Sequence, residues 1–144
     1  MKLKLDNDIL AANFFDECRL LGIVAPMKDY KFIWYINNML GMNMRLNINL
    51  EIPMIKKDRR YYFSVYEYEV PGSALTHYMY SNQYDGEYLL PEFKHLDFLW
   101  LTKFEYLDDH NFSKLLESVR KLPAVQWVSE MTNEKIKNKQ HLIF

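Results

Sequence analysis

Apolar and polar residues alternate along this chain with two different periods, and the longer period marks two helices. Residues 29–41 (DYKFIWYINNMLG) begin with an acidic side chain and end in Gly41, where a left-handed C-terminal cap would lie. Apolar side chains cover most of this segment, so the helix should be buried on more than one side. Residues 108–122 repeat the helical spacing, with Asp108 or Asp109 as the N-cap.

The shorter period marks strands in the middle of the chain. Residues 42–52 alternate without a fault, which predicts a half-buried strand with one wet face, and Pro53 should end it. The charged residues 56–60 (KKDRR) then form a connection. Residues 61–70 are rich in Tyr and Val, and a Pro-Gly-Ser turn joins them to a predicted hairpin partner at residues 75–82.

Strands are also predicted towards both ends of the chain. Residues 14–26 predict a strand centred on residues 19–24. Residues 96–106 are apolar on both faces in their middle, as expected for a strand at the centre of a sheet. Residues 124–131 predict the last strand, and residues 2–5 (KLKL) predict a short first one.

The order strand, helix, several strands, helix, strand indicates a single α+β domain over residues 1–144. Two helices that each bury one broad face should pack on one face of a mainly antiparallel sheet. The closest common arrangement is a ferredoxin-like layout with an additional hairpin strand. Residues 132–144 are expected to form a short helix or a frayed tail.

The amino-acid composition indicates what kind of core and which partners the protein has. Almost half of the 144 residues are hydrophobic, and 11 Tyr and 9 Phe against 4 Gly indicate an aromatic core. The net charge of −1 provides no global field that would attract a polyanion, which disfavours nucleic acid as a partner. The single cysteine, Cys18, is expected to be buried and unreactive, and it indicates a cytoplasmic protein. We expect no secretory signal and no membrane span.

Three ionisable side chains stand close together in the segment LLPEFKHLDFLWL (residues 89–101), namely Glu92, His95 and Asp97. Each can act as a general acid, a general base or a metal ligand, so they are the candidate catalytic residues. A structural interpretation is also open, in which Pro91 fixes a turn, Glu92 caps it and Asp97 bonds backbone groups where a strand begins. The spacing lacks the regularity of known metal-binding motifs, so no metal site is predicted.

The same segment resembles a known family. In LPEFKHLDF (residues 90–98), Pro91, Glu92 and Asp97 match the motif that names the IPExxxVDY family of small uncharacterised bacterial proteins. Leu, Leu and Phe stand in place of the motif's Ile, Val and Tyr. The helical segment and the Tyr-rich strand are similar to the same family's pattern, and the similarity covers most of the chain. The resemblance implies a single domain in a bacterial cytoplasm, and it implies no activity.

Tyr and Asn side chains provide further candidates for binding. An open sheet face carrying Tyr62, Tyr66 and Tyr68 could stack bases of single-stranded nucleic acid, with the KKDRR segment contacting phosphates. Tyr is also enriched at protein interfaces and packs in cores. Asn37 lies inside an apolar helix and must find a partner, which is either a neighbouring backbone or a ligand.

These observations favour a binding or protein-interaction module, most simply a homodimer, over an enzyme. The alternative is a small hydrolase or metal-assisted enzyme centred on Glu92, His95 and Asp97. A weaker alternative is single-stranded nucleic-acid binding on the Tyr-rich face. Four glycines leave little scope for a phosphate-binding loop, so no cofactor is expected.

Overall fold

The computed structural model describes residues 18–104, 108–132, 136–137 and 139–142. Its strands are β1 Cys18–Val24, β2 Arg45–Leu46, β3 Ile52–Lys56, β4 Arg59–Phe63, β5 Val65–Glu69, β6 Thr76–Ser81, β7 Gln83–Tyr84, β8 Glu87–Tyr88, β9 Phe98–Lys103 and β10 Trp127–Met131. The α-helices are α2 Asp29–Leu40 and α3 Asp109–Arg120, and the short 3₁₀ helices are η1 Ile48–Leu50, η2 Pro91–Phe93 and η4 Lys139–Leu142.

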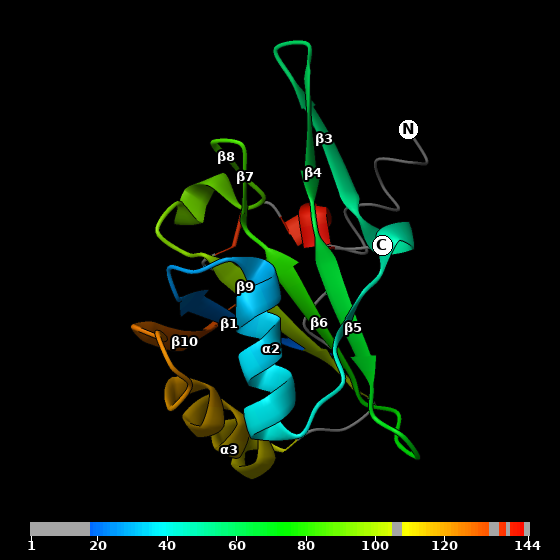
Figure 1. Cartoon of the computed structure of the whole chain (residues 1–144), viewed down its shortest axis with the longest axis vertical. Coiled ribbons are helices and arrows are strands. Elements are labelled where there is room, and N and C mark those ends of the chain that lie inside the picture. The colour runs from blue at the N-terminus through cyan, green and yellow to red at the C-terminus, as the bar shows by residue number, and fades with distance from the viewer. Residues whose placement is uncertain (1–17, 105–107, 133–135, 138, 143–144) are drawn as a thin grey trace.

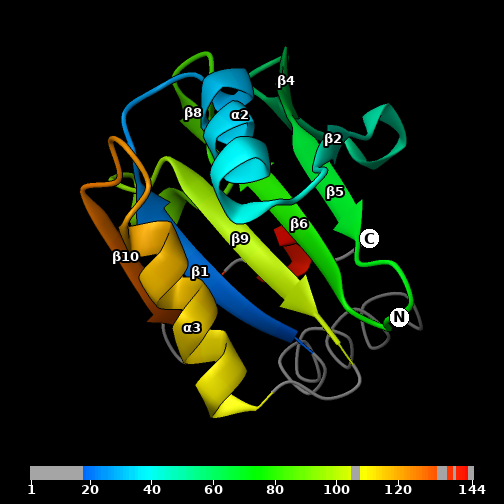
Figure 2. The same ribbon diagram turned by 60° about the horizontal axis from the view of Figure 1, so that its bottom comes forward.

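A six-stranded antiparallel sheet forms the centre of the molecule, in the order β10-β1-β9-β6-β5-β2. Helices α2 and α3 lie side by side on one face of it (Figures 1 and 2). The first four strands of that order, with α2 after β1 and α3 between β9 and β10, have the ferredoxin-like arrangement, and β5 and β2 extend its edge. The predicted α+β fold is confirmed.

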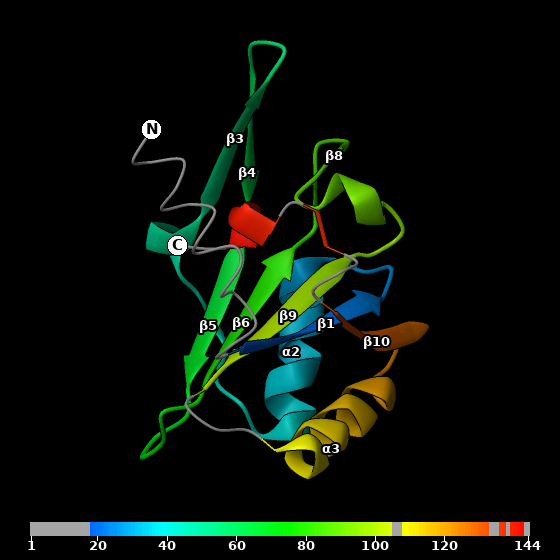
Figure 3. The same cartoon turned by 180° about the vertical axis from the view of Figure 1, so that it is seen from behind.

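Both faces of the sheet are covered, and β9 contributes to both cores. Phe98 and Trp100 point to the helix side, where the Phe98 ring stacks on Phe32 of α2 with centroids 4.6 Å apart. Leu99 and Leu101 point to the opposite core, which the β3–β4 hairpin and the C-terminal η4 help to cover (Figure 3). This two-sided burial between β1 and β6 confirms the prediction of a central strand.

The helix boundaries follow the sequence signals. Helix α2 begins at Asp29 and ends at Leu40, and Gly41 caps it with a left-handed φ of 67°. The Asp108 carboxylate caps α3 by accepting a hydrogen bond from the Asn111 N–H at 2.8 Å. Asn37 does bind a neighbouring backbone, because its side chain both accepts from the Met44 N–H and donates to the Met44 carbonyl.

The predicted strand over residues 42–52 is wrong. The two-residue β2 forms there, η1 follows it, and β3 begins only at Ile52. The Asn47 side chain accepts from the Asn49 N–H at 3.0 Å and donates to Glu67 at 2.9 Å, so a local turn replaces the ladder. Pro53 does not end a strand either, because it lies within β3, which pairs only with β4. Proline is tolerated in a strand with one free side.

The charged KKDRR segment is the tip of a long hairpin. Lys57 and Asp58 both adopt positive φ values, as a two-residue hairpin turn requires, and the β3–β4 hairpin extends away from the sheet in Figure 1. The predicted strand over residues 61–70 is divided at Ser64 into β4 and β5. The predicted first strand at residues 2–5 lies outside the described residues. None of the described helices is both long and apolar enough to cross a membrane.

Candidate functional site

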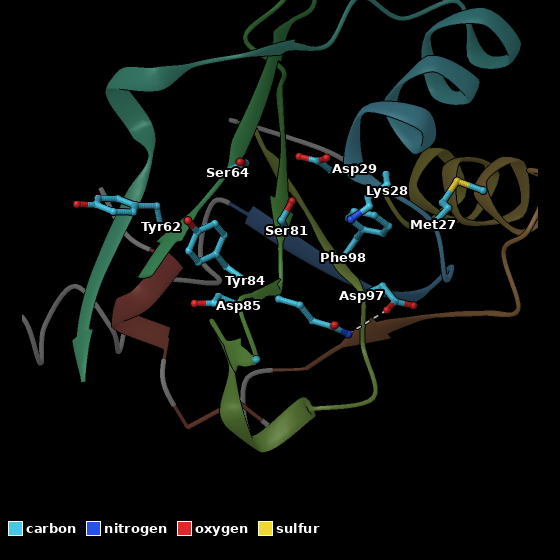
Figure 4. A pocket seen from close by; sticks show the side chains of 12 residues that line it. Met27, Lys28, Asp29, Tyr62, Ser64, Ser81, Tyr84, Asp85, Asp97 and Phe98 are labelled. Carbon is cyan, nitrogen blue, oxygen red and sulfur yellow. Dashed lines mark hydrogen bonds between the residues drawn. The ribbon is translucent and has the colours of Figure 1, made fainter. Parts of the chain in front are cut away.

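A polar pocket of about 660 Å³ opens where the start of α2 meets the two hairpins (Figure 4). Four separate stretches of the chain line it: the entry to α2, the end of β4, the residues from Ser81 to the β7–β8 turn, and the start of β9. Its lining residues are Met27, Lys28, Asp29, Tyr62, Ser64, Ser81, Gln83, Tyr84, Asp85, Gly86, Asp97 and Phe98.

The entry to α2 contributes two charged side chains. The Lys28 backbone is extended at the N-cap, and its side chain caps no backbone group. The Asp29 carboxylate accepts the Tyr30 N–H at 2.9 Å and the Tyr66 hydroxyl at 3.0 Å. Burial, and after it the Asp29 charge, raises the pKa of Tyr66, so this hydroxyl stays a donor. Asp29 is therefore fixed by neutral donors of the protein itself.

Asp97 lies one residue before β9, beside the loop that leads into α2. One carboxylate oxygen accepts the Ala25 N–H at 2.8 Å, and the other accepts the Gln83 side-chain amide at 3.0 Å. Burial raises the pKa of Asp97, and the bond from Ala25 opposes that rise. Asp97 therefore has two roles. It anchors the loop before α2 through its bond to Ala25, and it also lines the pocket.

Hydroxyl groups occupy the middle of the pocket. Ser64 and Ser81 lie on neighbouring strand ends, and the Ser81 N–H donates to the Ser64 carbonyl at 3.0 Å. The Ser81 hydroxyl is shielded from solvent and has no hydrogen-bond partner. Tyr84 and Asp85 approach from the far side in Figure 4, where Asp85 pairs with Arg59 at 3.0 Å.

Asn82 fixes the segment that carries Asp97. Its side-chain amide donates to the carbonyls of Phe93 and Leu96 at 3.0 and 2.9 Å, and its oxygen accepts the Leu90 N–H at 2.9 Å. The Asn82 backbone adds two bonds, donating to the Asp97 carbonyl and accepting from the Leu89 N–H. Asn82 is completely buried, so its side-chain bonds to Leu90 and Leu96 lie out of reach of water.

The three candidate catalytic residues have separate partners. Glu92 accepts the Lys137 N–H at 2.7 Å, and the exposed His95 ring contacts the rings of Phe93 and Trp127 with centroids 6.3 and 6.1 Å away. Only Asp97 of the three lines the pocket. Within the described ranges, no three His, Cys, Asp or Glu residues are grouped so that they could hold a metal ion.

The Tyr residues do not share one open face. Tyr66 and Tyr68 pack on the helix side of the sheet, whereas Tyr78 and Tyr80 pack in the opposite core. Tyr80 is completely buried. Only Tyr62 of the three candidate Tyr residues reaches the pocket, where its ring meets Tyr84 edge to face with centroids 6.4 Å apart.

A buried histidine lies away from the pocket, under the helices. His77 accepts the Trp100 indole N–H at Nδ1, 3.0 Å away, lies 3.3 Å from the Thr102 hydroxyl and stacks on Tyr68. Because an indole nitrogen only donates, Nδ1 carries no proton and the neutral ring carries its proton on Nε2. Burial lowers the pKa of His77 to about 4.

Most of the pocket residues carry no signal in the sequence that would select them. Lys28, Ser81 and Gln83 are ordinary polar residues of a helix start and a hairpin, and no motif contains them. The Asp85–Gly86 pair signals a turn, but it does not say which distant segments the turn meets. Comparison of the chain with protein-family models and with curated proteins finds no match. Function is therefore inferred from the site itself.

Proposed function

We propose that this protein is a binding module that holds a small polar molecule in the pocket between α2 and the hairpins. The observation that supports the proposal is the convergence of side chains from four stretches of the chain on one cavity. Asp29 and Asp97 are already fixed by hydrogen bonds, so a ligand would meet an ordered site. Concave sites with a few well-placed polar groups are where small ligands bind.

Binding fits the pocket better than catalysis. Asp97 is bound by two donors and Asp29 by two donors, so both carboxylates have structural tasks. A serine nucleophile needs a base within hydrogen-bond reach, and the Ser81 hydroxyl of the pocket bonds to no group. A hydrolase centred on Glu92, His95 and Asp97 would need these groups to converge, and their partners differ.

The proposal is tested by a thermal-shift screen of the full chain against small polar compounds, followed by calorimetry of each hit. Ser64→Leu should fill part of the pocket and abolish binding. Ser113→Leu, on the exposed face of α3, is the matched control and should bind normally. Equal binding to wild type and to Ser64→Leu would place the ligand elsewhere. Absence of any hit across the screen would overturn the proposal.

A second candidate function is self-association through α2. Tyr30 and Trp34 lie one turn apart on this helix and are 68% and 58% exposed, and Leu46 in β2 is 51% exposed. Aromatic side chains of this kind are enriched at protein interfaces. In light scattering at tens of micromolar we expect a dimer that Trp34→Ser dissociates, while Ile55→Ser on the distant hairpin has no effect. A monomeric wild type excludes this function.

We further propose that the protein belongs to the IPExxxVDY family and works in a bacterial cytoplasm. The resemblance of residues 90–98 to the motif supports the first part. The lone Cys18, buried in β1, supports the second because it has no second cysteine with which to form a disulfide. Fractionation of the source cells, with detection of the native chain, tests the location, and recovery outside the cytoplasm would contradict it.

A further inference from the structure

Two opposite charges line the pocket without an ionic partner. No ion pair between described residues includes Lys28 or Asp97, and the two do not pair with each other. The donors to Asp97 are a backbone N–H and an amide, which are both neutral. The Lys28 side chain turns towards the middle of the pocket in Figure 4. Lys28 is exposed and Asp97 is partly buried, so a ligand can reach both charges from solvent.

The other carboxylates of the pocket are already compensated. Asp85 pairs with Arg59 at 3.0 Å. Asp29 lies in the first turn of α2, where the helix dipole favours a negative charge, and it accepts two hydrogen bonds. The pocket therefore presents one available positive group at the entry to α2 and one available negative group at the start of β9.

We infer that the ligand is a small zwitterion, a molecule with one carboxylate and one ammonium group such as a free amino acid. This inference rests on the function proposed above and specifies the ligand of the same pocket. The carboxylate would meet the Lys28 ammonium beside the start of α2. The ammonium would meet Asp97 and the side-chain oxygen of Gln83, whose amide nitrogen already donates to Asp97.

The remaining lining groups suit the body of such a molecule. Phe98 and Tyr84 line the pocket with ring surface, and the Ser81 hydroxyl, which has no partner, would reach a bound group by rotation about its Cα–Cβ bond. The volume of about 660 Å³ leaves room for a side chain. An ammonium group beside Asp97 would favour the charged carboxylate, and so oppose the burial that raises the pKa of Asp97.

Calorimetry of the full chain with three matched probes tests the inference. The probes are each standard amino acid, its methyl ester, which keeps only the ammonium, and its N-acetyl derivative, which keeps only the carboxylate. We expect at least one free amino acid to bind, and both of its derivatives to bind roughly tenfold more weakly or worse, the effect of losing one charge-assisted contact.

Two variants assign the ends of the ligand. Lys28→Gln should weaken binding of the free amino acid roughly tenfold, and it should not weaken the already poor binding of the methyl ester. Lys31→Gln, which alters the next exposed lysine of α2, is the control and should bind like wild type. Asp97→Asn should weaken the free amino acid and spare the N-acetyl derivative, and circular dichroism checks its fold.

The possible results separate this inference from the function on which it rests. If an ester or an N-acetyl derivative binds as tightly as its free amino acid, the zwitterion is wrong and the pocket remains a binding site. If no amino acid binds while other compounds of the screen do, the ligand class is again wrong and the proposed function survives. If no compound of any class binds, both fail. Loss of binding in Lys31→Gln as well would refute the assignment of Lys28.

Discussion

The buried His77 should make the stability of this protein depend on pH in a defined direction. Its pKa is lowered from 6.5 to about 4, because the ring is buried and Nδ1 faces the Trp100 N–H. The unfolded chain therefore takes up this proton near pH 6.5, whereas the folded protein takes it up only near pH 4. Between these values the unfolded state binds more protons, so the contribution of His77 to stability is full above pH 6.5 and is lost as the pH falls towards 4.

The size of the effect follows from the two pKa values. Each pKa unit corresponds to about 1.4 kcal/mol of free energy, so acidification to about pH 4 should remove about 3 kcal/mol of stability through this one residue. That amount is a large fraction of the stability of an ordinary domain. Asp97 acts in the opposite direction, since a raised carboxyl pKa makes the folded state bind its proton more readily as the pH falls.

A variant separates His77 from the other groups that titrate in this range. In His77→Asn the amide oxygen can take the place of Nδ1 and accept the Trp100 N–H, but the side chain no longer titrates. The variant should be less stable at pH 7, because it loses the stacking of the ring on Tyr68. Its deficit should shrink by about 3 kcal/mol, or reverse, when both proteins are compared near pH 4.

Urea denaturation of both proteins at several pH values between 4 and 7 gives the measurement. The quantity compared is the difference between their free energies of unfolding, so that the contributions shared by the two proteins cancel. Two parallel curves of stability against pH would contradict the predicted role of His77. They would mean that His77 is protonated about equally in the folded and unfolded states, and hence that the ring is accessible to water in the native protein.

Three further substitutions test contacts that stabilise the fold, each by the same denaturation assay. Asn82→Ala should cost about 3 kcal/mol because the buried Leu90 N–H and Leu96 carbonyl lose their bonds to Asn82, whereas the exposed Asn38→Ala should have little effect; a loss below about 1 kcal/mol would contradict the role of Asn82. Gly22→Ala should cost about 1–3 kcal/mol, since its Cβ would lie 2.8 Å from Leu96 Cδ1, and an unchanged stability would show that Leu96 can move away. Asp108→Ala removes the N-cap of α3 and should cost about 1 kcal/mol; no loss would mean that water replaces the cap.

The parts of the fold that could be predicted are those that local signals specify. Asp29 and Gly41 mark the ends of α2 with side-chain and backbone chemistry that acts within one turn, and Asp108 does the same for α3. The apolar middle of β9 could be recognised as central because both of its faces need cover. In each case the residues that carry the signal also form the structure.

The segment over residues 42–52 shows where local reasoning fails. Apolar and polar residues alternate strictly in this segment. Leu46 and Ile48 are nevertheless exposed, so the apolar positions do not form a buried face. The hydrogen bonds of the Asn47 side chain compete with strand pairing and favour a turn. One of their partners, Glu67, lies 20 residues away in the sequence. The pocket was unpredictable for a similar reason, since Lys28 and Ser81 become neighbours of Asp97 only through sheet pairing.

The way Asn82 closes its loop bears on how the protein could change its ligand. The β7–β8 hairpin begins after Asn82, which follows β6, and ends before Leu89. The hydrogen bond from the Leu89 N–H to the Asn82 carbonyl closes the base of this hairpin. Gln83, Tyr84, Asp85 and Gly86, a third of the pocket lining, all lie beyond that base. The residues of this hairpin could therefore be exchanged without changing the rest of the fold. Such exchanges would change the side chains on one side of the pocket. The hydrogen bonds of Asn82 would still hold Asp97 and the start of β9 in place.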